Sequence, residues 1–282
     1  MSNNIMFVPG KEFYFYSYEE KCVYPFKINL FSRIIRIICR ITHISIPLIC
    51  LSKNILSVNK IIITDNTFSI SLIKTLMNYK SQEDLILYYL NNINENNKYM
   101  MKYFKIIYTF DSEDAKKFNI KYKHTPFSDK IKLNNSIVIY DTLFLGRAKE
   151  RITEIENLKH TFDKFGIKNK FLVLDTENKE LKLNSFINYR EYIDLISQTR
   201  CLIEINQKNQ VGCSLRFMES LFFQKKLITN NRNIINDYYY DYNNVYILGY
   251  DDRNIIDFIH LPYNDNNTNL SPLFFENWIE EF

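Results

Sequence analysis

Six polar residues that could recognise a ligand lie within one short stretch of this chain, residues 199–230. They are Glu204, Gln207, Gln210, Ser214, Arg216 and Glu219. Guanidinium, hydroxyl and amide groups donate hydrogen bonds to phosphate oxygens and sugar hydroxyls, so the cluster suits an anionic, hydroxyl-rich ligand. Whether these side chains meet depends on the elements that hold them.

The same stretch predicts a strand, a loop, a helix and a second strand. Cys201–Ile205 and Lys226–Thr229 are short apolar runs, as buried parallel strands are. Between them, Ser214 is suited to cap a helix whose apolar residues recur at helical spacing. Parallel α/β sheets bind ligands at the carboxyl ends of strands, beside helix N-termini, and the polar residues fall there.

Strands and helices alternate along the rest of the chain, which predicts an α/β fold with parallel sheets. The other predicted strands lie within Ile5–Tyr18 and at Lys60–Thr64, Asp84–Leu90, Lys105–Thr109, Ser136–Tyr140, Phe171–Leu174 and Val245–Leu248. The stretch 121–135 is polar and aperiodic, so we predict two domains, residues 1–133 and 134–282. The last helix, Pro272–Glu280, is a candidate to pack back on the first domain.

Composition excludes some classes of protein. With 46% hydrophobic and 16% aromatic residues, the 282-residue chain is not expected to be disordered. Its net charge of +4 is too small to indicate a nucleic-acid partner, although it fits a weak preference for an anionic ligand or membrane surface. The five cysteines lack metal-pair spacing and the four histidines are scattered, so we expect reduced thiols and no metal site.

The apolar run Leu30–Leu51 contains three arginines, at Arg33, Arg36 and Arg40. An arginine at the centre of a bilayer costs about 2.5–3.5 kcal/mol on insertion scales, so we do not expect the run to span a membrane. The arginines recur at helical spacing, which indicates an amphipathic helix. Two interpretations are open: a surface helix packed on a sheet, or a helix that contacts anionic lipid headgroups.

Two predicted helix N-termini face one edge of the second sheet. One follows Gly146 and carries Arg147 and Lys149, and the other follows Ser214 and carries Arg216. Free backbone amides and cationic side chains together suit a diphosphate group. Glu219 lies one turn after Arg216, where it could accept hydrogen bonds from ribose or instead pair with Arg216. Gln207 and Gln210 either bind sugar hydroxyls or belong to an exposed polar loop.

Three carboxylates are candidates for a catalytic base. Glu204 interrupts an apolar strand, so it either has a shifted pKa or pairs with a basic neighbour. Asp65 and Asp111 follow predicted strands of the first sheet and would face a cleft between the domains. Each could act as a general base, although an acidic residue at such a position commonly caps a helix.

Three segments of the chain resemble small bacterial glycosyltransferases of polysaccharide and lipopolysaccharide biosynthesis that have a GT-B fold. They are YTFDSEDAKKFNIKY (Tyr108–Tyr122), FLGRAKERITEIENL (Phe144–Leu158) and CLIEINQKNQVGCSLRFMESLFFQKKLITNN (Cys201–Asn231). The sequence departs from the family pattern after Glu219, with Ser220 and Phe223 in place of small residues and Gln224 in place of glycine.

The resemblance implies two Rossmann-like domains facing a cleft, with a glycan or lipid-linked acceptor on the first and a nucleotide-sugar donor on the second. It implies catalysis without a bound metal or other cofactor. Arg147, Lys149 and Arg216 would hold the diphosphate and Glu219 the ribose, with Gln210 and Ser214 near the sugar or phosphates. We therefore predict a cytoplasmic glycosyltransferase of bacterial surface-polysaccharide synthesis, with peripheral contact with the inner membrane left open as above.

Two other functions are compatible with the same residues. A nucleotide-sugar epimerase can share this architecture and would turn over its substrate without an acceptor. A non-catalytic subunit of a glycan-synthesis complex would bind no nucleotide sugar. A nucleic-acid binder is the weakest alternative, because the sequence shows no basic and aromatic platform.

Overall fold

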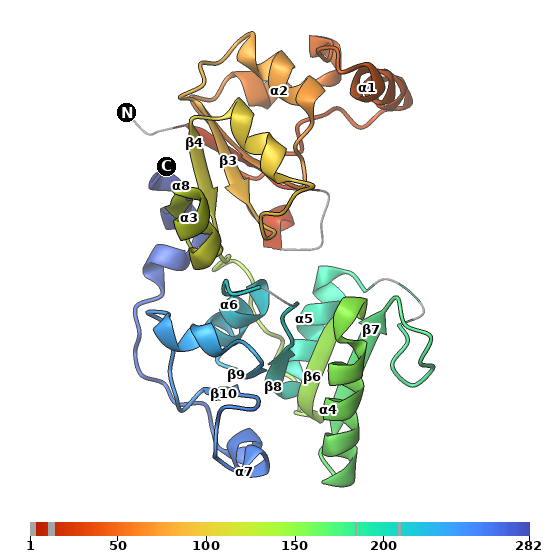
Figure 1. The fold of residues 1–282 in the computed structure, drawn as a ribbon, viewed down its shortest axis with the longest axis vertical. Helices are drawn as coiled ribbons and strands as arrows, with labels where there is room; N and C mark the ends of the chain where they lie inside the picture. The colour runs from red at the N-terminus through yellow and green to blue at the C-terminus, as the bar shows by residue number, and fades with distance from the viewer. Residues whose placement is uncertain (1–3, 11–14, 184, 186, 208–209) are drawn as a thin grey trace. The chain divides into compact units, whose positions relative to one another are not determined.

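The structure is a computed structural model that describes residues 4–10, 15–183, 185, 187–207 and 210–282 (Figure 1). The chain forms two compact units: residues 1–128 with 273–282, and residues 129–272. Each unit contains a five-stranded parallel sheet with helices between the strands. The predicted α/β fold with two parallel sheets is therefore confirmed.

In unit 1 the strands lie side by side in their chain order. They are β1 (Ile5–Val8), β2 (Lys60–Thr64), β3 (Leu85–Tyr89), β4 (Ile106–Thr109) and β5 (Lys121–Tyr122). The helices are α1 (Leu30–Thr42), α2 (Ile70–Met77), α3 (Ser112–Phe118) and α8 (Phe275–Glu280). Because every crossover runs in the same direction, right-handed connections place α1, α2 and α3 on one face of this sheet.

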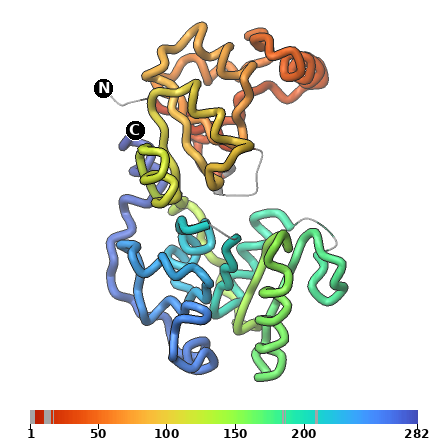
Figure 2. The backbone as a smooth tube through the Cα atoms, in the orientation of Figure 1, coloured from red at the N-terminus to blue at the C-terminus, as the bar shows by residue number. Residues whose placement is uncertain are grey.

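The opposite face of that sheet is covered by the C-terminal segment, which Figure 2 traces in blue against unit 1. Trp278 of α8 is fully buried and packs edge-on against Phe7 of β1 and Tyr88 of β3, with ring centroids 5.6 and 5.2 Å away. Its indole N–H donates to the carbonyl of His124 at 2.7 Å. The second face of the sheet is thus completed by residues more than 150 positions later in the chain.

In unit 2 the strand order is β7-β6-β8-β9-β10. The strands are β6 (Tyr140–Arg147), β7 (Asn169–Leu174), β8 (Thr199–Glu204), β9 (Lys226–Thr229) and β10 (Val245–Ile247). The helices are α4 (Ile152–Lys164), α5 (Tyr189–Ser197), α6 (Leu215–Phe222) and α7 (Ile255–His260). The first strand, β6, lies between the second and third strands, so the chain reverses direction across the sheet at β6 and β8.

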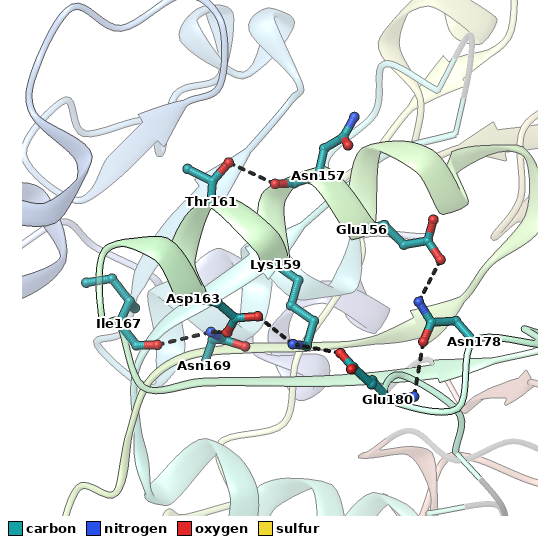
Figure 3. Close-up of polar contacts among 9 residues, drawn as sticks. All are labelled: Glu156, Asn157, Lys159, Thr161, Asp163, Ile167, Asn169, Asn178 and Glu180. Atoms are coloured by element: carbon teal, nitrogen blue, oxygen red, sulfur yellow. Dashed lines mark hydrogen bonds and ion pairs between the residues drawn. The ribbon is translucent and has the colours of Figure 1, made fainter.

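Polar contacts hold α4 to the start of β7, where Asn169 donates to Asp163 at 2.8 Å, and to the loop after that strand (Figure 3). Lys159 pairs with Asp163 at 2.6 Å and with Glu180 at 3.5 Å, and Asn178 donates to Glu156 at 2.8 Å. The helix ends as predicted, with Gly166 at φ +70°, a left-handed conformation that favours glycine. These contacts hold α4 against β7 and the loop that follows it.

One predicted strand is wrong. Ser136–Tyr140 was expected to open the second sheet, but the strand begins at Tyr140 and continues to Arg147. Ile137 is 86% exposed, whereas Leu143 is buried and pairs with both neighbouring strands, β7 and β8. The two runs are similarly apolar, so local composition could not distinguish the exposed one from the strand. Lys121–Tyr122, expected within the linker, pairs with β4.

Candidate functional site

The carboxyl ends of β6 and β8 diverge at the point where the chain reverses direction. β6 pairs with β7 along Thr142–Arg147, but it pairs with β8 only as far as Leu143. The last four residues of β6 therefore have no strand partner on the β8 side. In parallel α/β sheets such a switch point is where ligands bind. In unit 1 the described strands follow chain order, so that sheet has no equivalent point.

Two arginines bridge the two sides of this switch point. Arg216, on α6, donates from Nη2 to the carbonyl oxygen of Leu145 on β6 at 2.9 Å. Arg151, which follows β6, donates from Nη1 to the carbonyl oxygen of Ile205 at the end of β8. Arg216, which follows β8 in the chain, thus binds the backbone of β6, and Arg151, which follows β6, binds the backbone at the end of β8. Burial lowers the pKa of Arg151 and the charge of Arg216 acts in the same direction, whereas Glu204 and Glu154 act in the opposite one.

Arg151 was not among the residues singled out from the sequence. Its Nε and Nη2 also donate to the carbonyl oxygen of Arg147, at 3.2 and 3.1 Å. Gly146 gives it room, because a Cβ atom there would lie 3.2 Å from Nη2 of Arg151 and 3.1 Å from the ring of Phe144. In the sequence, Gly146 beside a strand end indicated a special backbone position. It did not indicate that the arginine five residues later belongs to the site.

The guanidinium group of Arg216 contacts several neighbours, but among the described residues one of its nitrogen atoms, Nη1, makes no hydrogen bond. Its guanidinium lies 4.7 Å from the ring centroid of Tyr192, and Nη1 lies 3.3 Å from Oε2 of Glu219. That Nη1 atom is buried and makes no hydrogen bond within the described part of the chain. Nη1 thus lies within ion-pair distance of Glu219 but donates no hydrogen bond there, so an anionic ligand that offers an acceptor oxygen would complete its partners.

Glu219 is directed toward the protein interior. Only 1% of the residue is exposed, and its two carboxylate oxygens accept hydrogen bonds from the hydroxyls of Tyr189 (3.1 Å) and Tyr192 (2.9 Å) on α5. Burial raises its pKa to about 7, although Arg216 and Tyr189 act in the opposite direction. The predicted Arg216–Glu219 pair is present, but on a buried face, where Glu219 positions Arg216.

Replacing Glu219 by glutamine should change how stability depends on pH. The raised pKa means that the folded protein keeps this proton up to about pH 7, whereas the unfolded chain loses it near 4.5. The contribution of Glu219 to stability therefore falls as pH rises from about 4.5 to 7 and is constant above. We expect the difference in unfolding free energy between wild type and Glu219→Gln to decrease across that window in urea denaturation. A difference that rises with pH would contradict the buried, protonated carboxyl.

Glu204 ties together three segments at the same edge. Its carboxylate is buried and accepts hydrogen bonds from the hydroxyl of Ser214 and, at 2.5 Å, from that of Thr229. Burial raises its pKa, while the hydrogen bonds and the charge of Arg151 act in the opposite direction. Ser214 is also the N-cap of α6, as predicted, and accepts from the backbone N–H of Arg216 at 3.0 Å. The end of β8, the end of β9 and the start of α6 are thereby fixed around Arg216.

The other predicted donor-binding residues lie at the same edge but are less enclosed. Arg147 is exposed and pairs with Asp175 at 2.9 Å. Lys149 has φ +44°, and burial, Arg151 and Arg147 lower its pKa. Gln207 is exposed, and the backbone N–H of Gln210 donates to its carbonyl at 3.0 Å. Residues 208–209 between them lie outside the described part of the chain.

Asp65 and Asp111 both follow strands of unit 1, as predicted. Asp65 accepts from the backbone N–H of Leu90 at 2.9 Å and from the amide of Asn91 at 2.8 Å, and burial raises its pKa to about 6. Asp111 caps α3 by accepting from the N–H groups of Glu113 and Asp114. The structure gives both aspartates a role in holding loops at the sheet edge.

Neither a metal cluster nor a disulfide is found among the residues that the structure describes. No group of three His, Cys, Asp or Glu side chains there could hold a metal ion. The five cysteines are free thiols, of which Cys22 is partly exposed and the others are buried.

Comparison with known proteins identifies similar backbones only. No protein-family model and no curated protein matches this chain. Among solved structures it is similar to "alpha-glucosyltransferase in complex with UDP and a 13-mer DNA containing a central A:G mismatch", with TM-score 0.45 and 10% identity over 62% of this chain and 63% of that chain. The present chain thus spans less than two thirds of the length of that glucosyltransferase.

Two further solved structures are similar. One is UDP-GlcNAc 2-epimerase from Methanocaldococcus jannaschii, with TM-score 0.41 and 13% identity over 80% of this chain and 76% of that chain. The other is the Glycosylation Associate Protein (Gap123) complex from Streptococcus agalactiae, with TM-score 0.35 and 12% identity over 67% of this chain and 45% of that chain. At such identities no residue role transfers from these proteins, so the site is interpreted from its own geometry.

Proposed function

We propose that unit 2 binds a nucleotide-sugar donor at the switch point between β6 and β8, and that the protein is a glycosyltransferase of the GT-B type. The observation that carries this proposal is the pair Arg151 and Arg216. Two like charges are held close together at a strand edge by hydrogen bonds to backbone carbonyls. A diphosphate would relieve their repulsion and supply acceptors for the buried Nη1 of Arg216.

The chemical step in this proposal is displacement at the anomeric carbon of the donor. The bond from that carbon to the diphosphate oxygen breaks, a bond to an acceptor hydroxyl oxygen forms, and the hydroxyl proton passes to a base. The diphosphate leaves with added negative charge, which the two guanidinium groups and the N-terminus of α6 would stabilise. Lys149, whose pKa is lowered, and Arg147 would add positive charge at the outer side.

The three carboxylates predicted as candidate bases, Asp65, Asp111 and Glu204, all accept hydrogen bonds within their own unit. Replacing each in turn by its amide and measuring the rate of transfer would identify the base. We further propose a glycan or lipid-linked oligosaccharide of a bacterial surface as acceptor and cytoplasmic location, on the resemblance of the three sequence segments alone.

Calorimetric and thermal-shift titrations with nucleotides and nucleotide sugars test the donor site. A ligand at about 100 times its Kd should stabilise the protein by about 2.7 kcal/mol. We expect a nucleoside diphosphate to bind much more tightly than the matching monophosphate, and the free nucleoside least, because the diphosphate makes the ionic contacts. Equal affinity for all three, or no binding, would contradict the proposal.

A second measurement separates transfer from epimerisation. The donor that binds is incubated with and without an acceptor glycan, and its sugar is followed by mass spectrometry and NMR. A transferase gives a new glycosidic bond only with acceptor present. Conversion of the donor to an epimer without acceptor would identify an epimerase instead.

A further inference from the structure

Helix α1 of unit 1 has its large apolar residues on the outside. Each of the following six is between 50% and 74% exposed: Leu30, Phe31, Ile34, Ile37, Ile38 and Ile41. The residues that α1 buries are instead the small Ser32 and Cys39. Soluble proteins rarely expose so many neighbouring apolar side chains, and such a patch marks an interaction site.

Polar contacts fix the inward face of α1 and therefore keep its apolar face directed outward. Ser32 donates to the carbonyl oxygen of Cys50 at 3.4 Å, and the carbonyl oxygen of Cys39 accepts from Ser71 of α2 at 2.5 Å. Asn29 caps the helix by accepting from the N–H of Ser32 at 2.7 Å. Figure 1 shows α1 at the margin of unit 1, beyond α2 and away from the sheet.

Positive charge lines one side of the exposed apolar stripe. At about 100° per residue, the six apolar side chains cover about a third of the helix circumference, and Arg33 and Arg40 fall beside them. A pocket of about 730 Å³ adjoins this flank and is lined in part by Arg33, Arg36 and Arg40. Arg36 is fixed by the hydroxyl of Tyr24 at 3.1 Å and the ring of Phe26 at 4.4 Å.

The surrounding sequence has no compensating acid. From Lys21 to Thr64 the chain carries seven lysines and arginines and no aspartate or glutamate. Arg33 and Arg40 are exposed and have neither an ion pair nor a side-chain hydrogen bond within the described part of the structure. Such a surface repels a second copy of itself and is complementary to a negatively charged partner.

We propose that α1 lies in the plane of a membrane and docks unit 1 on anionic phospholipids. Helices of this kind bury an apolar face about 5–10 Å deep at the headgroup boundary, with basic residues beside the phosphates. At 13 residues α1 is about 20 Å long, enough to lie on a bilayer. None of the helices in the described residues has the length and apolar character needed to cross one. Ile44, Leu48 and Ile49, which follow the helix in the sequence, are also exposed.

Flotation of the full chain with lipid vesicles tests this proposal without any nucleotide, so its outcome is independent of the donor site. We expect binding to phosphatidylcholine vesicles that contain phosphatidylglycerol, with weaker binding at high salt and little to phosphatidylcholine alone. Arg33→Gln with Arg40→Gln should lower the affinity about twenty-five-fold, because each basic residue near an anionic surface contributes about a factor of five. Ile34→Ser with Ile38→Ser should lower it roughly a hundred-fold.

Matched controls are available on unit 2. Ile137 is exposed, and Ile137→Ser should leave vesicle binding unchanged, as should Arg190→Gln with Lys164→Gln. All these changes are at exposed positions, so unchanged thermal unfolding serves as the check on folding. Equal binding to neutral and anionic vesicles, or an equal loss in the controls, would overturn the proposal. So would a dimer in sedimentation that Ile34→Ser with Ile38→Ser dissociates, without vesicle binding by the wild type.

Discussion

Replacing Arg216 by alanine is expected to lower kcat/KM for sugar transfer by about 10²–10³-fold, the usual cost of removing one preorganised donor to a developing anion. Leu145, Tyr192 and Glu219 hold the side chain in place before any ligand binds. Arg216→Lys keeps the charge but loses the planar fork, and we expect it to recover only part of the activity. Steady-state kinetics with the donor identified by titration measure both.

Arg151→Ala provides the companion experiment. If the two guanidinium groups grip one diphosphate, the losses in Arg151→Ala, Arg216→Ala and the double variant should be non-additive. Arg190→Ala, an exposed arginine on α5, should retain normal kinetics and serves as the control. Transfer close to wild-type rate in Arg216→Ala, with its thermal unfolding unchanged, would refute the donor site.

Replacing Trp278 by alanine should destabilise unit 1 by about 3–5 kcal/mol, the usual cost of removing a large buried aromatic side chain. The indole contacts Phe7, Tyr88 and Phe282, and its N–H satisfies the carbonyl of His124. Urea denaturation measures the change. Trp278→Phe should lose less, because it keeps most of the ring contacts. Tyr238→Ala, at a residue that is 79% exposed, should change stability by less than about 0.5 kcal/mol.

A loss below about 1 kcal/mol in Trp278→Ala would contradict the packing of α8 on the sheet of unit 1.

The strands that the sequence predicted best are those buried on both faces. Lys60–Thr64 and Lys226–Thr229 have the bounds expected from their apolar runs, because a continuous run is typical of a central parallel strand. The prediction of a strand at Ser136–Tyr140 relied on the same kind of apolar run and was wrong. Such a run favours a strand, but it does not show that a neighbouring strand is present to pair with it. The exposed Ile137 illustrates this limit.

The site was harder to predict than the strands, because its partners are distant in sequence. Arg216 and Ser214 were recognised from local spacing. The tyrosines that hold Glu219 lie 27 and 30 residues earlier, on a different helix. Arg151 reaches Ile205 only because β6 lies beside β8, and strand order cannot be read from spacing. For α1 the sequence left two interpretations open, because periodicity gives two faces without saying which is buried.

The return of the C-terminal segment to unit 1 has a consequence for biosynthesis. Unit 2 is continuous, from Asp129 to Pro272, and can fold as soon as it leaves the ribosome. Unit 1 emerges first, but one face of its sheet, with Phe7 and Tyr88, has no Trp278 to cover it until residues 273–282 are made. Unit 1, most of which is translated first, is therefore expected to complete its folding last. Until residues 273–282 are made, its uncovered sheet face is expected to need protection from aggregation.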